Sequence, residues 1–123
     1  MALDRENVDR SYLFGRLLNV LEDAENEATH RVDITMANTE RYCQHPLTYA
    51  AKFRERIQPL LHNLPVELVD KYETEMEEIM CLMPENEELD KALGPTVWLG
   101  YYGERGHLRE IKKEMKSNEA NGN

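Results

Sequence analysis

Apolar residues recur every three or four positions along most of the chain, which is the period of a helix with one buried face. The clearest example is the stretch 8–29, for which Asn7 or Asp4 is the expected cap. Its apolar stripe consists of Leu13, Leu17, Val20 or Leu21, Ala24 and Ala28. Gly15 costs roughly 1 kcal/mol relative to alanine inside a helix. Its presence in this stretch therefore suggests that a neighbouring helix packs closely there.

The same period predicts three helices in the middle of the chain. A short helix is expected near 38–43, and a longer one begins at Pro46, a residue suited to a first helical turn. Pro59 lacks an amide donor, so a kink or break is expected there. The third helix covers 66–82, with an apolar face turned inward and its glutamates turned to water.

The last third of the chain is punctuated by glycine and proline. A short helix over 86–93 and a helix from Pro95 are expected, with Gly103 and Gly106 weakening the latter before a final helical stretch. Trp98, Tyr101 and Tyr102 are interpreted as core packing of this region.

These elements predict an all-α fold, a compact bundle of four to five helices, because strand patterns are short everywhere. A single domain is expected over 1–116, followed by a polar, disordered tail over 117–123. The sequence contains no signal-peptide pattern and no apolar run long enough to span a membrane. The isolated Cys43 and Cys81 suit a reducing compartment, so a cytoplasmic protein is expected.

Charge is distributed unevenly along the chain, whose net charge is −9. Residues 67–90 hold ten acidic side chains against Lys71 alone, whereas 31–62 carry a small positive excess. The protein is therefore expected to have an acidic side and a mildly basic side.

The basic region holds the best candidate for a binding surface. Arg41, His45, Tyr49, Lys52 and Arg56 are spaced by four, four, three and four, so they share one helical face if the helix at Pro46 extends backwards. Such a face suits a phosphate backbone, with Tyr49 or Tyr42 available for stacking. The alternative is an ordinary solvated polar face, which is the usual role of charges on helices.

Sequence patterns for enzymes are scarce. Phosphate-binding glycine loops and a nucleophile elbow are absent, so a protein without catalytic activity or cofactor is expected. Glu-x-x-His occurs twice, at Glu27–His30 and Glu104–His107. Two such runs plus two further glutamates hold the metals of di-iron carboxylate bundles. Both runs are expected near helix ends, so two exposed histidines are the favoured interpretation.

Three runs resemble a known family. Residues 11–22 (SYLFGRLLNVLE), 39–42 (TERY) and 99–105 (LGYYGER) are similar, in order and spacing, to runs near the C-terminal end of the large subunit of type I-C CRISPR Cascade. In that family this helical region is also made as a separate protein, the small subunit of the complex. The resemblance implies a helical bundle along the belly of the complex that supports the guide RNA–target DNA hybrid and the displaced DNA strand.

The resemblance also implies partners and candidate contact residues. The partners are the other Cascade subunits, with a second copy of the chain as one option, together with the backbones of guide RNA and target DNA; no membrane is involved. Arg16, Arg41 and Tyr42 match family runs, whereas Lys52, Arg54 and Arg56 are inferred from face and charge. The chain departs from the family at Cys43, at 44–46 and at Pro59. The alternative function is an acidic helical module in which 67–90 binds proteins or mimics nucleic acid.

Overall fold

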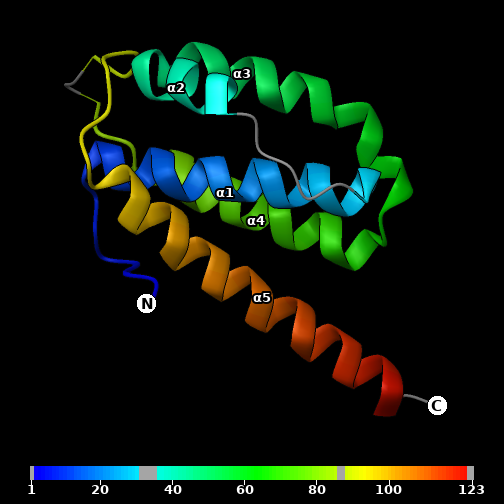
Figure 1. The fold of residues 1–123 in the computed structure, drawn as a ribbon. Helices are drawn as coiled ribbons and strands as arrows, with labels where there is room; N and C mark the ends of the chain where they lie inside the picture. Colours follow the sequence, from blue (N-terminus) through cyan, green and yellow to red (C-terminus); the bar gives the residue numbers. More distant parts are fainter. Residues whose placement is uncertain (1, 31–35, 86–87, 122–123) are drawn as a thin grey trace.

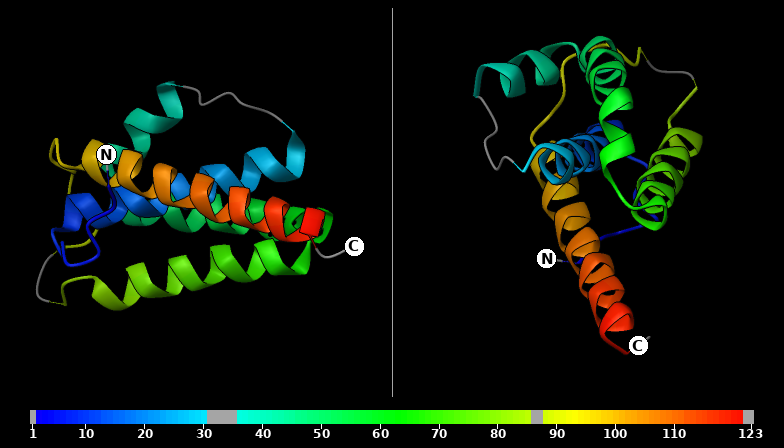
Figure 2. Two further views of the ribbon diagram at one scale, coloured as in Figure 1. Left: turned by 90° about the horizontal axis from the view of Figure 1, so that it is seen from below. Right: turned by 90° about the vertical axis from the view of Figure 1, so that its right-hand side faces the viewer.

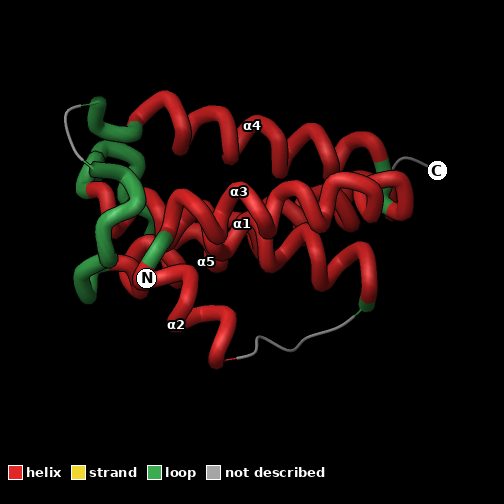
Figure 3. Tube along the Cα trace, turned by 90° about the horizontal axis from the view of Figure 1, so that it is seen from above, coloured by secondary structure: helices red, strands yellow, loops and turns green. Residues whose placement is uncertain are grey.

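Four α-helices are arranged around a central one, α1, in the computed structural model of this protein (Figure 1). Residues 2–30, 36–85 and 88–121 are described. Over these ranges every regular element is a helix, as the sequence predicts (Figure 3). The elements are α1 (Arg10–Thr29), α2 (Met36–Gln44), α3 (Pro46–Ile57), the 3-10 helix η1 (Gln58–Asn63), α4 (Val66–Leu82) and α5 (Val97–Asn121).

The central helix is buried on nearly all sides over its first three turns. Leu13, Phe14 and Leu21 have no exposed surface, because α3, α4 and α5 each pack against α1. Asp9 caps the helix by accepting a hydrogen bond from the Tyr12 amide, in place of the expected Asn7 or Asp4. Even polar side chains such as Ser11, Arg16 and Asn19 are buried in these turns, because neighbouring helices cover α1.

The first and last helices meet backbone to backbone. A Cβ atom added at Gly15 would lie 1.9 Å from the carbonyl oxygen of Val97, and one added at Gly100 would lie 1.9 Å from that of Tyr12. Only glycine permits this approach. The close packing expected at Gly15 is therefore confirmed, and it places α5 along one side of α1 (Figure 2).

The middle of the chain follows the predicted breaks. Pro46 opens α3, and Pro59 lies in η1, where the α-helix has given way to a 3-10 turn. His45 separates α2 from α3 with a non-helical φ of −137°. Two backbone hydrogen bonds nevertheless span the junction, from the His45 amide to Arg41 and from the Tyr49 amide to His45, so the two helices form a bent unit.

The prediction of a short helix over 86–93 is wrong for 88–93, which form a turn and irregular loop; 86–87 lie outside the described residues. The reason is a buried arginine on α1. Arg10 donates hydrogen bonds to the carbonyl oxygens of Leu89, Lys91 and Ala92, at 3.2, 2.6 and 2.9 Å. The guanidinium therefore supplies the hydrogen bonds that a helix would otherwise provide to these carbonyl oxygens.

The helix at the end of the chain is longer than expected. α5 runs without a break through Gly103 and Gly106, and it continues to Asn121, into the segment expected as a polar tail. Residues 122–123 of that segment lie outside the described residues. Within the described part of the chain, no helix is long and apolar enough to cross a membrane.

Candidate functional site

The predicted basic residues of α2 and α3 lie at the surface. Arg41, Lys52, Arg54 and Arg56 are all exposed, and the His45 side chain is 62% exposed. The bend at His45 interrupts the single continuous stripe, because Arg41 lies on α2 and the other three lie on α3. We call Arg41, Lys52 and Arg56 the α2–α3 basic surface.

Two of these cations make cation–π contacts with aromatic rings on the same helix. The Lys52 ammonium lies 5.1 Å from the centre of the Tyr49 ring, and the Arg56 guanidinium lies 4.4 Å from that of Phe53. Arg56 also donates a hydrogen bond of 2.9 Å to Glu25. Exposed ion pairs of this kind contribute only about 0–1 kcal/mol, so a phosphate can replace the carboxylate.

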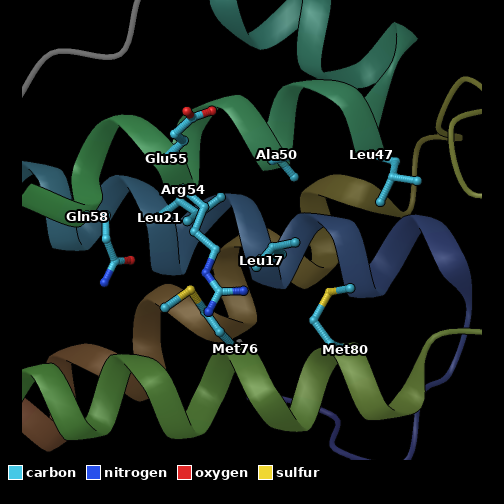
Figure 4. A pocket seen from close by; sticks show the side chains of 10 residues that line it. Leu17, Leu21, Leu47, Ala50, Arg54, Glu55, Gln58, Met76 and Met80 are labelled. Atoms are coloured by element: carbon cyan, nitrogen blue, oxygen red, sulfur yellow. The ribbon is translucent and has the colours of Figure 1, made fainter.

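Arg54 has a different environment from the other three. It lines a groove of about 400 Å³ between α3 and α4, floored by Leu17 and Leu21 of α1. Figure 4 shows its side chain pointing from α3 across this groove toward Met76 of α4. Its charge is therefore directed away from the α3 surface that carries Lys52 and Arg56.

Two of the predicted contact residues are buried and serve the fold. Arg16 has no exposed surface, and its Nε donates a 2.8 Å hydrogen bond to Glu104. Tyr42 is 2% exposed, and its hydroxyl donates a 2.7 Å hydrogen bond to the Phe14 carbonyl oxygen. Arg16 and Tyr42 are therefore removed from the candidate contacts with nucleic acid, because neither side chain reaches the surface in this structure.

Arg16 is the centre of a buried ionic network that joins three helices. Its Nη2 lies 3.2 Å from Glu78 and 3.4 Å from Glu75 of α4, while Nε binds Glu104 of α5. From the N-terminal segment, Arg5 reaches both α4 glutamates. The network therefore joins α1, α4, α5 and the segment before α1.

Within this network one carboxyl holds its proton at neutral pH. Burial, followed by the hydrogen bond with Glu75, raises the pKa of Glu104 to about 8. Burial would also raise the pKa of Glu75, but hydrogen bonds from Glu104 and Arg5 outweigh it and lower that pKa. The two carboxyls therefore act as a neutral donor and a charged acceptor.

The expectation that the α4 glutamates all face water is wrong for Glu75, which is 5% exposed. A signal for this was present in the sequence. Glu75 lies three residues after Tyr72 and four before Ile79, so it occupies the apolar stripe of α4.

The two Glu-x-x-His runs do not meet. Glu27 binds Lys112 at 3.1 Å, far from Glu104 and His107. Contrary to expectation, Glu104 lies mid-helix and faces inward. Atoms of Glu75, Glu104 and His107 lie within 4.8 Å of one another. Arg5 is 2.6 Å from the His107 ring nitrogen, so this group is part of the ion-pair network.

The aromatic cluster of α5 is only partly in the core. Tyr101 is 4% exposed and donates a 2.5 Å hydrogen bond to Glu22. Trp98 and Tyr102 are instead 40% and 45% exposed, so the interpretation of all three as core packing is wrong for these two. A continuous α5 turns positions 98 and 102 outward, whereas the sequence pattern predicts a helix weakened at Gly103 and Gly106.

Comparison with protein families identifies the class of this helical protein: it is CRISPR-associated. The matching family is Cas_Csd1, described as CRISPR-associated protein (Cas_Csd1), and the match covers residues 1–109. The chain therefore belongs to this family, which is that of the type I-C large subunit. A search of curated proteins found no match.

Proposed function

We propose that this chain is the non-catalytic small subunit of a type I-C Cascade complex, working in the cytoplasm. In this role it contacts the backbone of the guide RNA–target DNA hybrid with the α2–α3 basic surface. The family match over residues 1–109 carries the proposal, because it includes all three runs on which the resemblance rests.

The distribution of charge supports this role. Arg41, Lys52 and Arg56 are exposed on the α2–α3 layer, while the exposed acids Glu73 and Glu77 lie on α4. Backbone contacts carry no sequence information, which suits a complex that reads its target by base pairing. With a net charge of −9, the isolated chain binds weakly, and its affinity arises when neighbouring subunits hold the hybrid against it.

The first test is assembly. The tagged chain, co-expressed with the other type I-C subunits and a guide RNA, is expected to co-purify with them in a fixed ratio. If it remains alone while the other subunits assemble, the small-subunit role is wrong.

The second test concerns the basic surface. In the assembled complex, Lys52→Ala with Arg56→Ala is expected to weaken target binding equally for any guide. The slope of log affinity against log salt should fall by about two, one for each phosphate that is no longer neutralised. Lys71→Ala with Lys91→Ala removes the same charge from exposed positions elsewhere and is the matched control. Equal weakening by both pairs of substitutions would mean that only total charge matters, and the surface would not be a binding site.

One observation favours a second candidate. Glu67, Asp70, Glu73 and Glu77 are all exposed or half-buried on α4 and form an acidic face. An acidic interaction module would bind a basic protein through this face. It would then lose its partner when Glu73 and Glu77 are changed to Gln, with no effect of the Lys52 and Arg56 substitutions.

A further inference from the structure

The outer face of α5 carries a stripe of aromatic and basic residues. It consists of Trp98, Tyr102, Arg105, Arg109, Lys113 and Lys116, spaced by four, three, four, four and three. This spacing keeps all six on one side of a helix. At a rise of 1.5 Å per residue the stripe is about 27 Å long. We call it the α5 stripe.

This stripe is open to solvent along its length. Trp98 and Tyr102 are 40% and 45% exposed, Arg105 is half-buried, and the three cations beyond it are exposed. Arg109, Lys113 and Lys116 form no ion pair with any residue of the described chain. Glu110 of α5 lies three residues before Lys113, at the border of the stripe, and Glu114 lies farther around the helix.

A buried tyrosine holds the two exposed rings in place. Tyr101 meets Trp98 edge to face at 5.7 Å and Tyr102 at 5.1 Å between ring centres. Tyr101 itself is fixed by its hydrogen bond to Glu22 of α1. Large rings held rigidly in water lose little conformational entropy when a flat ligand stacks on them.

We propose that the α5 stripe binds single-stranded nucleic acid. Bases stack on Trp98 and Tyr102, and the phosphates that follow them contact Arg109, Lys113 and Lys116. A duplex does not suit the rings, because stacking on a side chain needs a base whose face is free.

This inference deepens the proposed function, and it rests on that function only for the source of the strand. The α2–α3 basic surface would take the paired hybrid, and the α5 stripe would take unpaired nucleotides. Figure 2 shows α3 and α5 on opposite sides of α1, so the two ligands have separate sites.

Trp98 is the only tryptophan of the chain, so its fluorescence reports on the site directly. Titration of the full chain with a 20-nucleotide oligo(dT) at about 50 mM salt is expected to quench this fluorescence. At this salt concentration the Debye length is little more than about 10 Å, so the acidic residues of α4 repel a strand bound at α5 only weakly. A paired RNA–DNA hybrid of equal length is expected to quench much less. Equal quenching by both ligands, or none by oligo(dT), would refute the proposal.

Two pairs of variants separate stacking from other contacts. Tyr102→Leu should weaken oligo(dT) binding by about fivefold to a hundredfold, whereas Tyr102→Phe should keep it, since every base stacks on an aromatic face. Arg109→Ala with Lys113→Ala should reduce the salt slope by about 1.4, the value for two phosphates of a single strand. Lys71→Ala with Lys91→Ala is the matched charge control and should leave the slope unchanged.

The same variants distinguish this inference from the proposed function. If Tyr102→Leu prevents co-purification with the other subunits while oligo(dT) binding is unchanged, the α5 stripe is a protein contact and the inference is wrong. If the Lys52 and Arg56 substitutions leave hybrid binding intact while Tyr102→Leu lowers oligo(dT) binding, the α2–α3 surface is wrong and the α5 stripe stands. Circular dichroism melts of each variant verify folding.

Discussion

Arg16 has no exposed surface, yet it carries a full charge among three glutamates from two other helices. Removing the charge from water costs several kcal/mol, and only the surrounding carboxyls offset that cost. The buried Arg16 charge therefore requires the glutamates around it, and these glutamates can be buried only because Arg16 lies beside them.

We expect Arg16→Met to lower the free energy of unfolding by about 3–5 kcal/mol, because it leaves the charged Glu75 without its buried counter-charge and Glu104 without its hydrogen-bond donor. Adding Glu104→Leu to Arg16→Met should recover part of this loss, since it removes the fully buried carboxyl that the substitution leaves without its hydrogen bond from Arg16. Urea denaturation of the single and double variants provides the measurement. Arg54→Met, an exposed position on α3, is the control and should change stability by about 0.5 kcal/mol or less. A double variant less stable than Arg16→Met would contradict the pairing.

Glu104 makes stability depend on pH. Its pKa is raised from 4.5 to about 8 on folding, so between these values the folded chain holds a proton that the unfolded chain has released. Stability from this group is complete below the unfolded pKa and is lost as the pH rises through about 8.

The melting temperature is therefore expected to fall as the pH rises from 4.5 to about 8, and Glu104→Gln should flatten that fall because the amide stays neutral. Glu114→Gln, on an exposed turn of the same helix, should leave the slope as it is. Melting curves followed by circular dichroism across this range are the measurement. A slope unchanged in Glu104→Gln would assign the titration to another group.

At the scale of the elements, the contact between α1 and α5 places the strictest limit on side-chain size, because the two backbones touch at Gly15 and Gly100. In an isolated helix Gly15→Ala would add roughly 1 kcal/mol of stability. In this fold the new Cβ would lie 1.9 Å from the Val97 carbonyl oxygen, so the helices must separate.

We expect Gly15→Ala to destabilise the protein by about 3 kcal/mol or more, which is above the usual cost of overpacking because the obstacle is backbone. Gly94→Ala is the control, because its nearest neighbour would be the Ser11 hydroxyl oxygen at 3.6 Å. Thermal melts compare the two variants. A Gly15→Ala protein as stable as the parent would mean that α5 does not sit against α1 as described.

The helices themselves were predictable, because their apolar periods and prolines act locally. The predicted helix over 66–82 matches α4, and the breaks at Pro46 and Pro59 both occur. The uninterrupted α5 was not predictable from local preference. Gly100 and Gly103 weaken a helix in isolation, yet both lie against the N-terminal part of the chain, and that packing outweighs their propensity.

The candidate site was predictable only in part, because charge can be read from the sequence but burial depends on contacts between distant residues. Charge identified Arg41, Lys52, Arg54 and Arg56 as surface cations, and the structure exposes all four. Charge alone could not reveal that Arg16 is buried, because its burial depends on Glu104, 88 residues away. The exposure of Trp98 likewise follows from which face of α5 meets α1, which is a tertiary property.

At the scale of the whole molecule, three sides of the bundle have different chemistry. α3 presents cations, α4 presents acids, and α5 presents rings followed by cations. Because α3 and α5 lie on opposite sides of α1 (Figure 2), we expect a hybrid and a single strand to bind together.

Native gels of the assembled complex, with a labelled target strand paired to the guide RNA and a differently labelled oligo(dT), provide the measurement for this expectation, and they should show one band that carries both labels. Competition between the two ligands, with each displacing the other, would contradict two separate sites.

The pairing of the first helix with the last also governs how a newly made chain folds. Helical bundles usually fold quickly because their contacts are local. Here the buried face of α1 is completed by a helix that begins at Val97. At about 5–20 residues per second, roughly 5–18 s pass between the synthesis of Thr29, the end of α1, and that of Asn121, the end of α5. For that interval its apolar residues are incompletely covered, so a delay between Thr29 and Val97 lengthens the chain's exposure to chaperones and aggregation.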